Sequence, residues 1–321
     1  MKILPIVWKF LKITIAGAIV FSIAFAFGVF DEQIEVPEIK ADIFDFGKQT
    51  NTAKFVNSLK SLGHESPRPF DLNGNVVYFS NKRYLDDPRM IMTRYQDEFK
   101  AEGINSKRWM HTNDNSGEFL KASMSGEIVP LSIEDDYVSM GGMLTRGDIE
   151  KDEDFNKIIE TAVKGPAALF RGHRFIEIKK NSNGQGSEAI AMFSGEDFDF
   201  KKMKPGYDGP GAEPDVEFPS CPGCTRLTRF ADLRSDSPYR INSFQTRRSM
   251  DGTSKFYIDS MARRGWTMTE TTSMFRKLKK HVGFEGDDAQ QLQFSKNGEF
   301  MTVLLYPNDN GGIDVHGTIT Y

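Results

Sequence analysis

One pattern occurs twice in this chain and constrains its fold more than any other feature: an amphipathic helix that ends in glycine. The first copy, TRYQDEFKAEGIN, starts at Thr93, and the second, SKFYIDSMARRGW, starts at Ser254. Apolar residues spaced by four positions, followed by a glycine that can adopt a left-handed conformation, are typical of a surface helix and its C-terminal stop. The matched positions, 162 residues apart, are Tyr95 with Tyr257, Asp97 with Asp259, Phe99 with Met261, and Gly103 with Gly265.

Similar elements surround the two copies. Each helix follows a strand candidate and precedes strand pairs that begin at a Gly-Glu turn, Gly126-Glu127 in the first copy and Gly298-Glu299 in the second. A repeated order of elements favours duplication of one folding unit over a chance match of short motifs. We therefore expect a duplicated α+β module, in which the shared tyrosine and glycine serve packing and helix termination.

The first copy contains further helix and strand candidates. The run TAKFVNSLKSLG predicts a helix before Gly63, and Asp87-Pro88 favours the start of the next helix, because aspartate can cap free N–H groups and proline suits the first turn. The run DFNKIIETAVKGP has apolar residues at helical spacing and predicts a third helix. Strands are predicted at NVVYFSNKRYL, FLKASM, EIVPLSI, VSMGGML, RFIEIKK, EAIAMFS and DFDFKKM, the last with Asp197 and Asp199 on its outer face.

The last 30 or so residues predict the clearest sheet. RINSFQT, before the second helix, is a strand candidate, and QLQFSKNGEFMTVLLYP is a hairpin that turns at Asn297-Gly298. GGIDVHGTITY adds a final strand, in which Ile313, Val315, Thr318 and Thr320 alternate with polar neighbours. This alternation predicts a sheet that one helix covers on one face.

Together these patterns predict an α+β protein with an N-terminal transmembrane helix followed by two domains, each an antiparallel sheet packed against helices. The run KPGYDGPGAEPDVEFPSCPG is rich in Pro and Gly and is typical of a linker between domains. The expected segments are a membrane anchor or signal peptide over 1–30, a tether over 31–51, a first α+β domain over 52–204, a linker over 205–218 and a second α+β domain over 219–321.

The N-terminus predicts the location of the protein. Residues Ile13–Phe30 form an uncharged apolar run, which follows lysines and precedes Asp31 and Glu32. An apolar helix of this length nearly spans a membrane, and the charges place the N-terminus in the cytoplasm and the globular part in the periplasm or outside the cell. The alternative is a signal peptide cleaved near Ala24-Phe25-Ala26, which would release the protein to the periplasm. In the first interpretation the inner membrane is a partner.

Charge is distributed unevenly along the chain. The formal net charge is −4, yet residues 225–280 hold 13 basic against 5 acidic residues. Within this stretch SMFRKLKKHVGF predicts an amphipathic helix that could lie on anionic lipid or on an acidic envelope protein. The side chains proposed for that contact are Arg276, Lys277, Lys279 and Lys280. No nucleic-acid-binding motif accompanies them, so we do not expect nucleic acid as a partner.

Both cysteines of the chain lie in one motif, Cys221-Pro-Gly-Cys224. In an oxidising compartment this spacing is typical of a structural disulfide, and it is also the spacing of redox-active pairs. A thioredoxin-like interpretation would need a strand before the motif and a helix after it, for which TRLTRFADL is the candidate. Free thiols or a metal-bound pair are the remaining interpretation, although the chain has no second cysteine pair to complete a metal site.

The span Cys221–Tyr321 resembles a small domain that recurs in uncharacterised exported bacterial proteins. The residues that carry the resemblance are Pro222-Gly223 at the start, Phe256-Tyr257 in the helix, Gly265-Trp266 after it, and the hairpin and final strand that follow. The resemblance implies an exported α+β domain. It implies no activity.

Motifs for catalysis are absent from the sequence. The five histidines are scattered without zinc-binding spacing, and no phosphate-binding loop or nucleophile elbow occurs. We expect a non-catalytic binding or scaffolding module of the bacterial envelope, without cofactor or metal. Two alternatives stay open: a thiol–disulfide oxidoreductase that uses Cys221 and Cys224, and a carrier of a small ligand.

Overall fold

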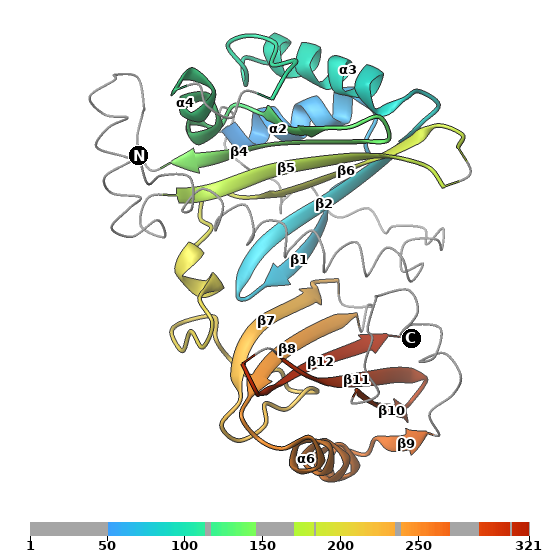
Figure 1. The fold of residues 1–321 in the computed structure, drawn as a ribbon. Helices are drawn as coiled ribbons and strands as arrows, with labels where there is room; N and C mark the ends of the chain where they lie inside the picture. The colour runs from blue at the N-terminus through green and yellow to red at the C-terminus, as the bar shows by residue number, and fades with distance from the viewer. Residues whose placement is uncertain are drawn as a thin grey trace.

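A single antiparallel sheet of twelve strands organises the chain (Figure 1). The strand order is β3-β4-β5-β6-β2-β1-β7-β8-β12-β11-β10-β9, and every neighbouring pair is antiparallel. The computed structural model describes residues 51–112, 117–145, 170–182, 184–234, 239–269, 289–308 and 310–320.

The N-terminal half of the sheet contains six described strands and three described helices. Its helices are α2 (Asn51–Ser61), α3 (Pro88–Ala101) and α4 (Gly117–Ser125). Its strands are β1 (Arg68–Leu72), β2 (Asn75–Tyr84), β3 (Val129–Ile133), β4 (Tyr137–Thr145), β5 (Phe170–Lys180) and β6 (Ser187–Ser194). A 3-10 turn, η3 (Phe200–Met203), follows β6.

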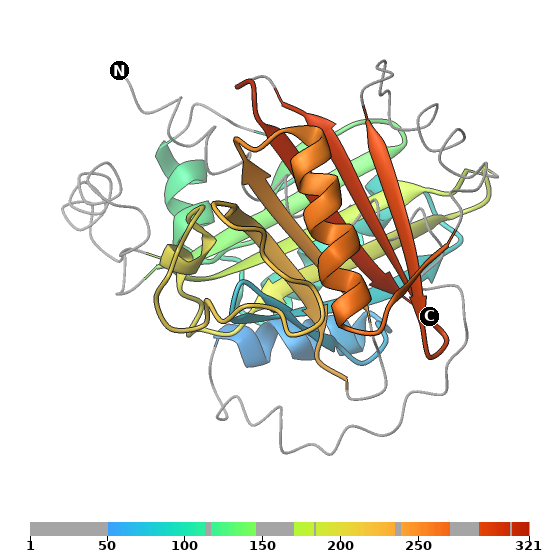
Figure 2. The same ribbon diagram turned by 90° about the horizontal axis from the view of Figure 1, so that it is seen from below.

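The C-terminal half also contains six strands, with one described helix, α6 (Met250–Arg263). Its strands are β7 (Thr225–Asp232), β8 (Arg240–Thr246), β9 (Thr267–Thr269), β10 (Gln290–Lys296), β11 (Glu299–Pro307) and β12 (Ile313–Thr320). Figure 2 shows α6 lying across the strands of this half.

The two halves repeat one strand order. From the central pair outwards the N-terminal half runs β1-β2-β6-β5-β4-β3, and the C-terminal half runs β7-β8-β12-β11-β10-β9. In both halves a hairpin precedes a helix, and a four-stranded meander returns to pair with the second strand of the hairpin. The bounds of α3 and α6 differ by the same 162 positions that align Tyr95 with Tyr257.

The predicted helices α3 and α6 are confirmed, and their ends have physical causes. Helix α3 begins with Pro88 after Asp87, and α6 begins at Ser249, whose Oγ accepts a hydrogen bond from the Gly252 N–H at 3.2 Å. Both end at glycines in the left-handed region, Gly103 at φ +66° and Gly265 at φ +78°. The predicted helix before Gly63 and the hairpin at Asn297-Gly298 are confirmed as well.

Both halves place their helices on the outer side of the curved sheet (Figure 1). In the N-terminal half, Phe55, Tyr95 and Phe99 of α2 and α3 are fully buried against strands β2, β4, β5 and β6. In the C-terminal half, Tyr257 and Met261 of α6 are fully buried against strands β8, β10, β11 and β12. Each helix layer therefore has its own apolar core.

The halves join through β1 and β7, whose backbones pair from Phe70 opposite Asp232 to Leu72 opposite Phe230. The rings of Phe70 and Phe230 stack with centroids 4.8 Å apart, on the face of the sheet opposite the helices. Arg68 and Asp232 form an ion pair across the same junction, and the Asp232 side chain is fully buried. Backbone pairing, an apolar core and a buried ion pair thus make one continuous sheet.

This continuity corrects the predicted fold class. The sequence predicted two domains, each with its own antiparallel sheet, whereas the structure has one twelve-stranded sheet with comparatively few helices. The prediction failed because β1 and β7 are edge strands of their own halves, and pairing between edge strands depends on contacts between distant parts of the chain. The expectation that duplication would give two independent sheets is corrected with it.

The predicted membrane location is also corrected. Within the described ranges no helix is both long enough and apolar enough to cross a membrane. The longest described helices, α3 and α6, have 14 residues, which at 1.5 Å per residue span about 21 Å of a hydrocarbon core of about 30 Å. The predictions of a transmembrane helix and of a single-pass membrane protein are contradicted on this finding. The segment Ile13–Phe30, on which they rested, lies outside the described residues.

Three local predictions also changed. The run FLKASM is part of helix α4 and not a strand. DFDFKKM contains the 3-10 turn η3, and Asp199 caps this turn by accepting a hydrogen bond from the Lys201 N–H at 2.9 Å. TRLTRFADL forms strand β7 and not a helix. The helix predicted at DFNKIIETAVKGP lies outside the described residues.

Candidate functional site

Strands β10, β11 and β12 alternate between buried and partly exposed side chains, and this alternation defines the candidate site. Leu292, Met301, Val303 and Val315 are buried in the core beneath α6. The alternate side chains point to the opposite face, where no described helix covers them, and we call this set the open face. Its members are Gln291, Gln293, Ser295, Phe300, Thr302, Leu304, Tyr306, Asp314, His316, Thr318 and Thr320.

Strand register arranges the open face in rows. Gln293, Thr302 and Thr318 lie directly opposite one another across β10, β11 and β12. A second row joins Leu304 to His316 and continues to Ser243 on β8. Phe300 is the most exposed member, with 54% of its surface accessible. The rows therefore present hydroxyl, amide and aromatic groups side by side on a rigid sheet.

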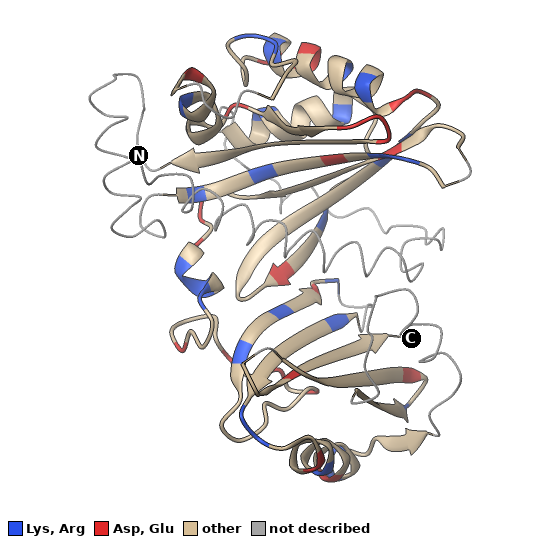
Figure 3. Cartoon of the chain, in the orientation of Figure 1, with Lys and Arg blue, Asp and Glu red and all other residues tan. Residues whose placement is uncertain are grey.

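Little charge lies on the open face. Asp314 is its one ionisable acid, and Asp314 Oδ1 already accepts a hydrogen bond from Asn308 Nδ2 at 2.8 Å. No lysine or arginine belongs to the set. Figure 3 shows the same distribution: charged residues occupy the helices and strands β7 and β8, while most of β11 and β12 is uncharged. A surface of this kind suits a partner of low charge, because it offers hydrogen bonds and apolar contact without a strong field.

The most ordered part of the open face is a hydrogen-bonded cluster around His316. Ser243 Oγ lies 2.7 Å from His316 Nδ1, and the Tyr306 hydroxyl bonds to Nε2. The rings of Tyr306 and His316 are nearly parallel, at 3°. Burial lowers the pKa of His316, although Asp314 opposes the shift, and burial together with Asp314 raises the pKa of Tyr306 to about 12. Both groups are therefore neutral near pH 7.

A hydroxyl beside a histidine also occurs in serine hydrolases, so the chemistry of this cluster needs a test against geometry. A nucleophilic serine must reach substrate, and Ser243 is only 3% exposed. Tyr306 occupies the second ring nitrogen, where such a mechanism would place an orienting carboxylate. The cluster satisfies the buried polar groups of three strands, and its geometry favours a structural role over catalysis.

The equivalent face of the N-terminal half is covered. Phe175 and Met192 on that face are 8% and 6% exposed, and they pack with Phe198 in the core at the junction. The Phe198 ring also contacts His173, with ring centroids 4.9 Å apart. Burial of His173 lowers its pKa to about 4. In the described part of the chain, an open sheet face thus belongs to the C-terminal half.

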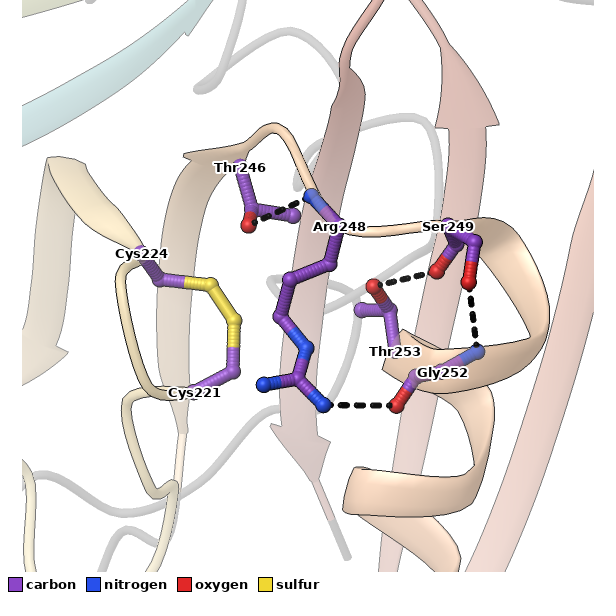
Figure 4. The surroundings of a disulfide bond; sticks show 7 residues. All are labelled: Cys221, Cys224, Thr246, Arg248, Ser249, Gly252 and Thr253. Atoms are coloured by element: carbon purple, nitrogen blue, oxygen red, sulfur yellow. Dashed lines mark hydrogen bonds between the residues drawn. A yellow bond between two sulfur atoms is a disulfide. The ribbon is translucent and has the colours of Figure 1, made fainter.

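The predicted cysteine pair is joined by a disulfide, in the turn that leads into β7 (Figure 4). Cys221 is 2% exposed and lies in the core beneath α6, while Cys224 packs against its edge. Gly223 in the turn has a φ of +73°, which favours glycine. A redox-active pair exposes its attacking sulfur and commonly sits at a helix start, whereas here Cys221 is buried, Cys224 is partly buried, and the pair precedes a strand. The geometry favours a structural bond.

The other predicted site residues cannot be placed. Arg276, Lys277, Lys279 and Lys280 lie outside the described residues, so their proposed contact with anionic lipid or an acidic protein stays a prediction. Among the residues that the structure describes, no group of three or more His, Cys, Asp or Glu side chains is arranged to hold a metal ion.

Comparison with known proteins identifies no relative: no family model, curated protein or solved structure matches the chain. The resemblance of Cys221–Tyr321 to an exported bacterial domain stays a prediction.

Sequence reasoning missed the open face because it misassigned the alternation in β12. The sequence suggested one face with Ile313, Val315, Thr318 and Thr320, but Ile313 and Val315 point to α6, whereas Thr318 and Thr320 point away. The inner position between them is Gly317, which lies against the Phe218 ring. A glycine gives no hydropathy signal, so the alternation is hidden at that residue.

Proposed function

We propose that this protein is a non-catalytic binding module that holds a partner protein on the open face of its C-terminal half. The observation that supports the proposal is the alternation of burial in β10, β11 and β12, which leaves a sheet face of low charge without a covering layer in the described structure. Sheet faces of this kind usually pack against a second layer. Exposed aromatic residues such as Phe300 are enriched where proteins bind one another.

Two features make the open face suitable for binding. The core beneath α6 fixes the backbone from below, because residues such as Met301 and Val303 are fully buried. The Ser243–His316–Tyr306 cluster fixes side chains on the face itself. A pre-ordered surface loses little conformational entropy when it binds, which increases affinity.

The oxidoreductase alternative receives less support. Its chemistry requires an accessible thiol, and Cys221 is 2% exposed within the core beneath α6. The disulfide holds the segment before β7 against that core.

Site-specific photo-crosslinking tests the proposal. A photoreactive phenylalanine analogue replaces Thr318 on the open face or, as a control, Lys255, which is exposed on α6. We expect a discrete crosslinked protein at position 318 in the cells that produce this protein, and none at 255. Adding Thr302→Arg, which places a charge in the same row, should abolish the adduct without lowering the melting temperature by more than a few degrees.

Two results would contradict the proposal. One is equal crosslinking at positions 318 and 255, which would indicate random collision. The other is a folded protein, shown by an unchanged circular dichroism spectrum, that forms no adduct at 318 although a known complex crosslinks in the same cells.

A further inference from the structure

A buried arginine in the N-terminal half has unused hydrogen-bonding capacity. Arg174 on β5 is 3% exposed, and its guanidinium carbon lies 5.5 Å from the ring centroid of Phe55 on α2. NH1 donates a hydrogen bond to the Gly126 carbonyl at 3.0 Å. Nε and NH2 are buried and have no hydrogen-bond partner among the residues that the structure describes. These two atoms form one edge of the guanidinium, the edge that commonly binds two oxygens of the same anion.

No carboxylate in the described ranges contacts the charge of Arg174. Burial lowers the pKa of Arg174 to about 10, so the group remains protonated at neutral pH. Glu196 is the carboxylate whose charge opposes the lowering of the Arg174 pKa. It already pairs with Arg171 at 3.1 Å and accepts a hydrogen bond from the Asn51 N–H at 3.1 Å. Two guanidinium groups therefore share one carboxylate. An unpaired buried charge is costly, and a bound anion would remove that cost.

Thr52, in the first described turn of α2, and Arg171 contribute further buried donors to the same region. Thr52 lies one turn before Phe55 on the buried face of the helix. The residue is 1% exposed, and its hydroxyl has no partner within the described part of the chain. Nε of Arg171 is also buried and unpartnered.

We propose that a small oxyanion, of the size of phosphate or a carboxylate, binds between the Arg174 guanidinium and the first turn of α2. Two of its oxygens accept hydrogen bonds from Nε and NH2 of Arg174, and the Thr52 hydroxyl donates to the same anion. Because Arg174 is almost completely buried, the ligand is a small free anion and not the head group of an intact membrane. This site is separate from the open face and does not depend on the proposed binding function.

Anion-dependent stability tests the site in the full-length protein. Melting temperatures are measured in inorganic phosphate, in acetate and in chloride at equal ionic strength. We expect phosphate or acetate to raise the melting temperature of the wild type above its value in chloride, since a ligand stabilises the state that binds it. Arg174→Met should abolish this difference. It should also be at least as stable as the wild type in chloride, because it removes an unpaired charge.

Two further variants control the experiment. Arg234→Met removes another largely buried arginine, whose partner Asp232 keeps its ion pair with Arg68, and it should retain the response to anions. Thr52→Val removes one donor at nearly constant shape, and it should weaken phosphate binding several-fold in equilibrium dialysis with labelled phosphate. One bound phosphate per wild-type chain is expected.

The proposal is overturned if wild-type melting is the same in all three salts and dialysis detects no bound phosphate or acetate. It is also overturned if Arg174→Met retains full anion binding. If Arg174→Met fails to fold, Thr52→Val decides: unchanged phosphate and acetate binding in that folded variant would reject the site.

Discussion

The two halves of the sheet share one strand order but surround their equivalent tyrosines differently. In the N-terminal half the Tyr95 hydroxyl bonds to His64 and lies 3.2 Å from the Tyr84 hydroxyl. In the C-terminal half the Tyr257 hydroxyl is buried and has no partner among the described side chains and backbone groups. Both rings are fully buried at the same place in their helices. The ring is therefore the shared packing element, while the polar contacts of the hydroxyl differ between the halves.

A second contrast concerns the two faces of each half. The N-terminal half is buried on both faces, beneath α2 and α3 on one side and by Phe198 and its neighbours on the other. In the C-terminal half, β7 and β8 are also buried on the second face near the junction, but no described helix covers the open face of β10, β11 and β12. The same strand order thus gives an N-terminal half with both sheet faces buried and a C-terminal half with the open face on one side.

The largest effect is expected at the inner position of the final strand. Gly317 pairs with Asn242, and its counterpart in the other half, Ala191, pairs with Ser80. A Cβ at Gly317 would overlap the Phe218 ring, so Gly317→Ala should lower the free energy of unfolding by about 3 kcal/mol in urea titrations. Ala191→Gly, the matched exchange, should cost about 1 kcal/mol. A Gly317→Ala variant as stable as the wild type would show that Phe218 moves freely.

Acid should destabilise the N-terminal half through His64. Burial lowers the pKa of His64 to about 4, below its ordinary value of 6.5. Between these two pH values the unfolded chain binds a proton at His64 that the folded chain does not bind. Stability is therefore complete above about pH 6.5 and is lost as pH falls towards 4, by about 2 to 3 kcal/mol at pH 4.5. Urea titrations at pH 7.5 and 4.5 measure this loss, and His64→Gln should reduce it.

The matched control for the acid experiment is His316→Gln in the other half. Burial lowers the pKa of His316 as well, but Asp314 opposes the shift, so this variant should change the acid sensitivity less than His64→Gln. An equal or larger change would contradict the contrast between the two histidines.

The disulfide should stabilise the C-terminal half by an intermediate amount. A bond that closes so short a loop between Cys221 and Cys224 is expected to contribute about 2 kcal/mol, and replacement of both residues by alanine removes it. Its reduction potential should lie below about −300 mV, as for structural disulfides. A potential well above this value, together with unchanged stability in the double alanine variant, would revive the oxidoreductase alternative.

Sequence patterns predicted the local elements well because helix caps and hairpin turns depend on neighbouring residues. Asp87-Pro88, Gly265 and Asn297-Gly298 each mark an element boundary that the structure confirms. The pairing of β1 with β7 was not predictable, because it joins Phe70 to Asp232 across the chain. The open face was missed for a related reason: whether a second layer covers a sheet is decided by distant segments, and Gly317 conceals the alternation locally.

The smallest effects are expected at the two tyrosines, and they test the first contrast directly. Tyr95→Phe removes a hydroxyl that bonds to His64 Nε2, so a buried nitrogen loses its partner and the free energy of unfolding should fall by about 1 to 2 kcal/mol. Tyr257→Phe removes a hydroxyl without a partner, so stability should stay within about 0.5 kcal/mol or increase.

Each tyrosine variant is the control for the other, because the apolar ring is kept at equivalent positions. Equal losses of stability in both variants would mean that the Tyr257 hydroxyl has a hydrogen-bond partner in solution, such as an ordered water. The two hydroxyls would then differ only in whether a side chain or a water binds them. If only Tyr95→Phe loses stability and the double variant Tyr95→Phe/His64→Gln loses no more than the single variants, the two side chains act as one unit. The hydrogen bond between Tyr95 and His64 would then be a feature of the N-terminal half, whereas both halves share the packing of the tyrosine ring.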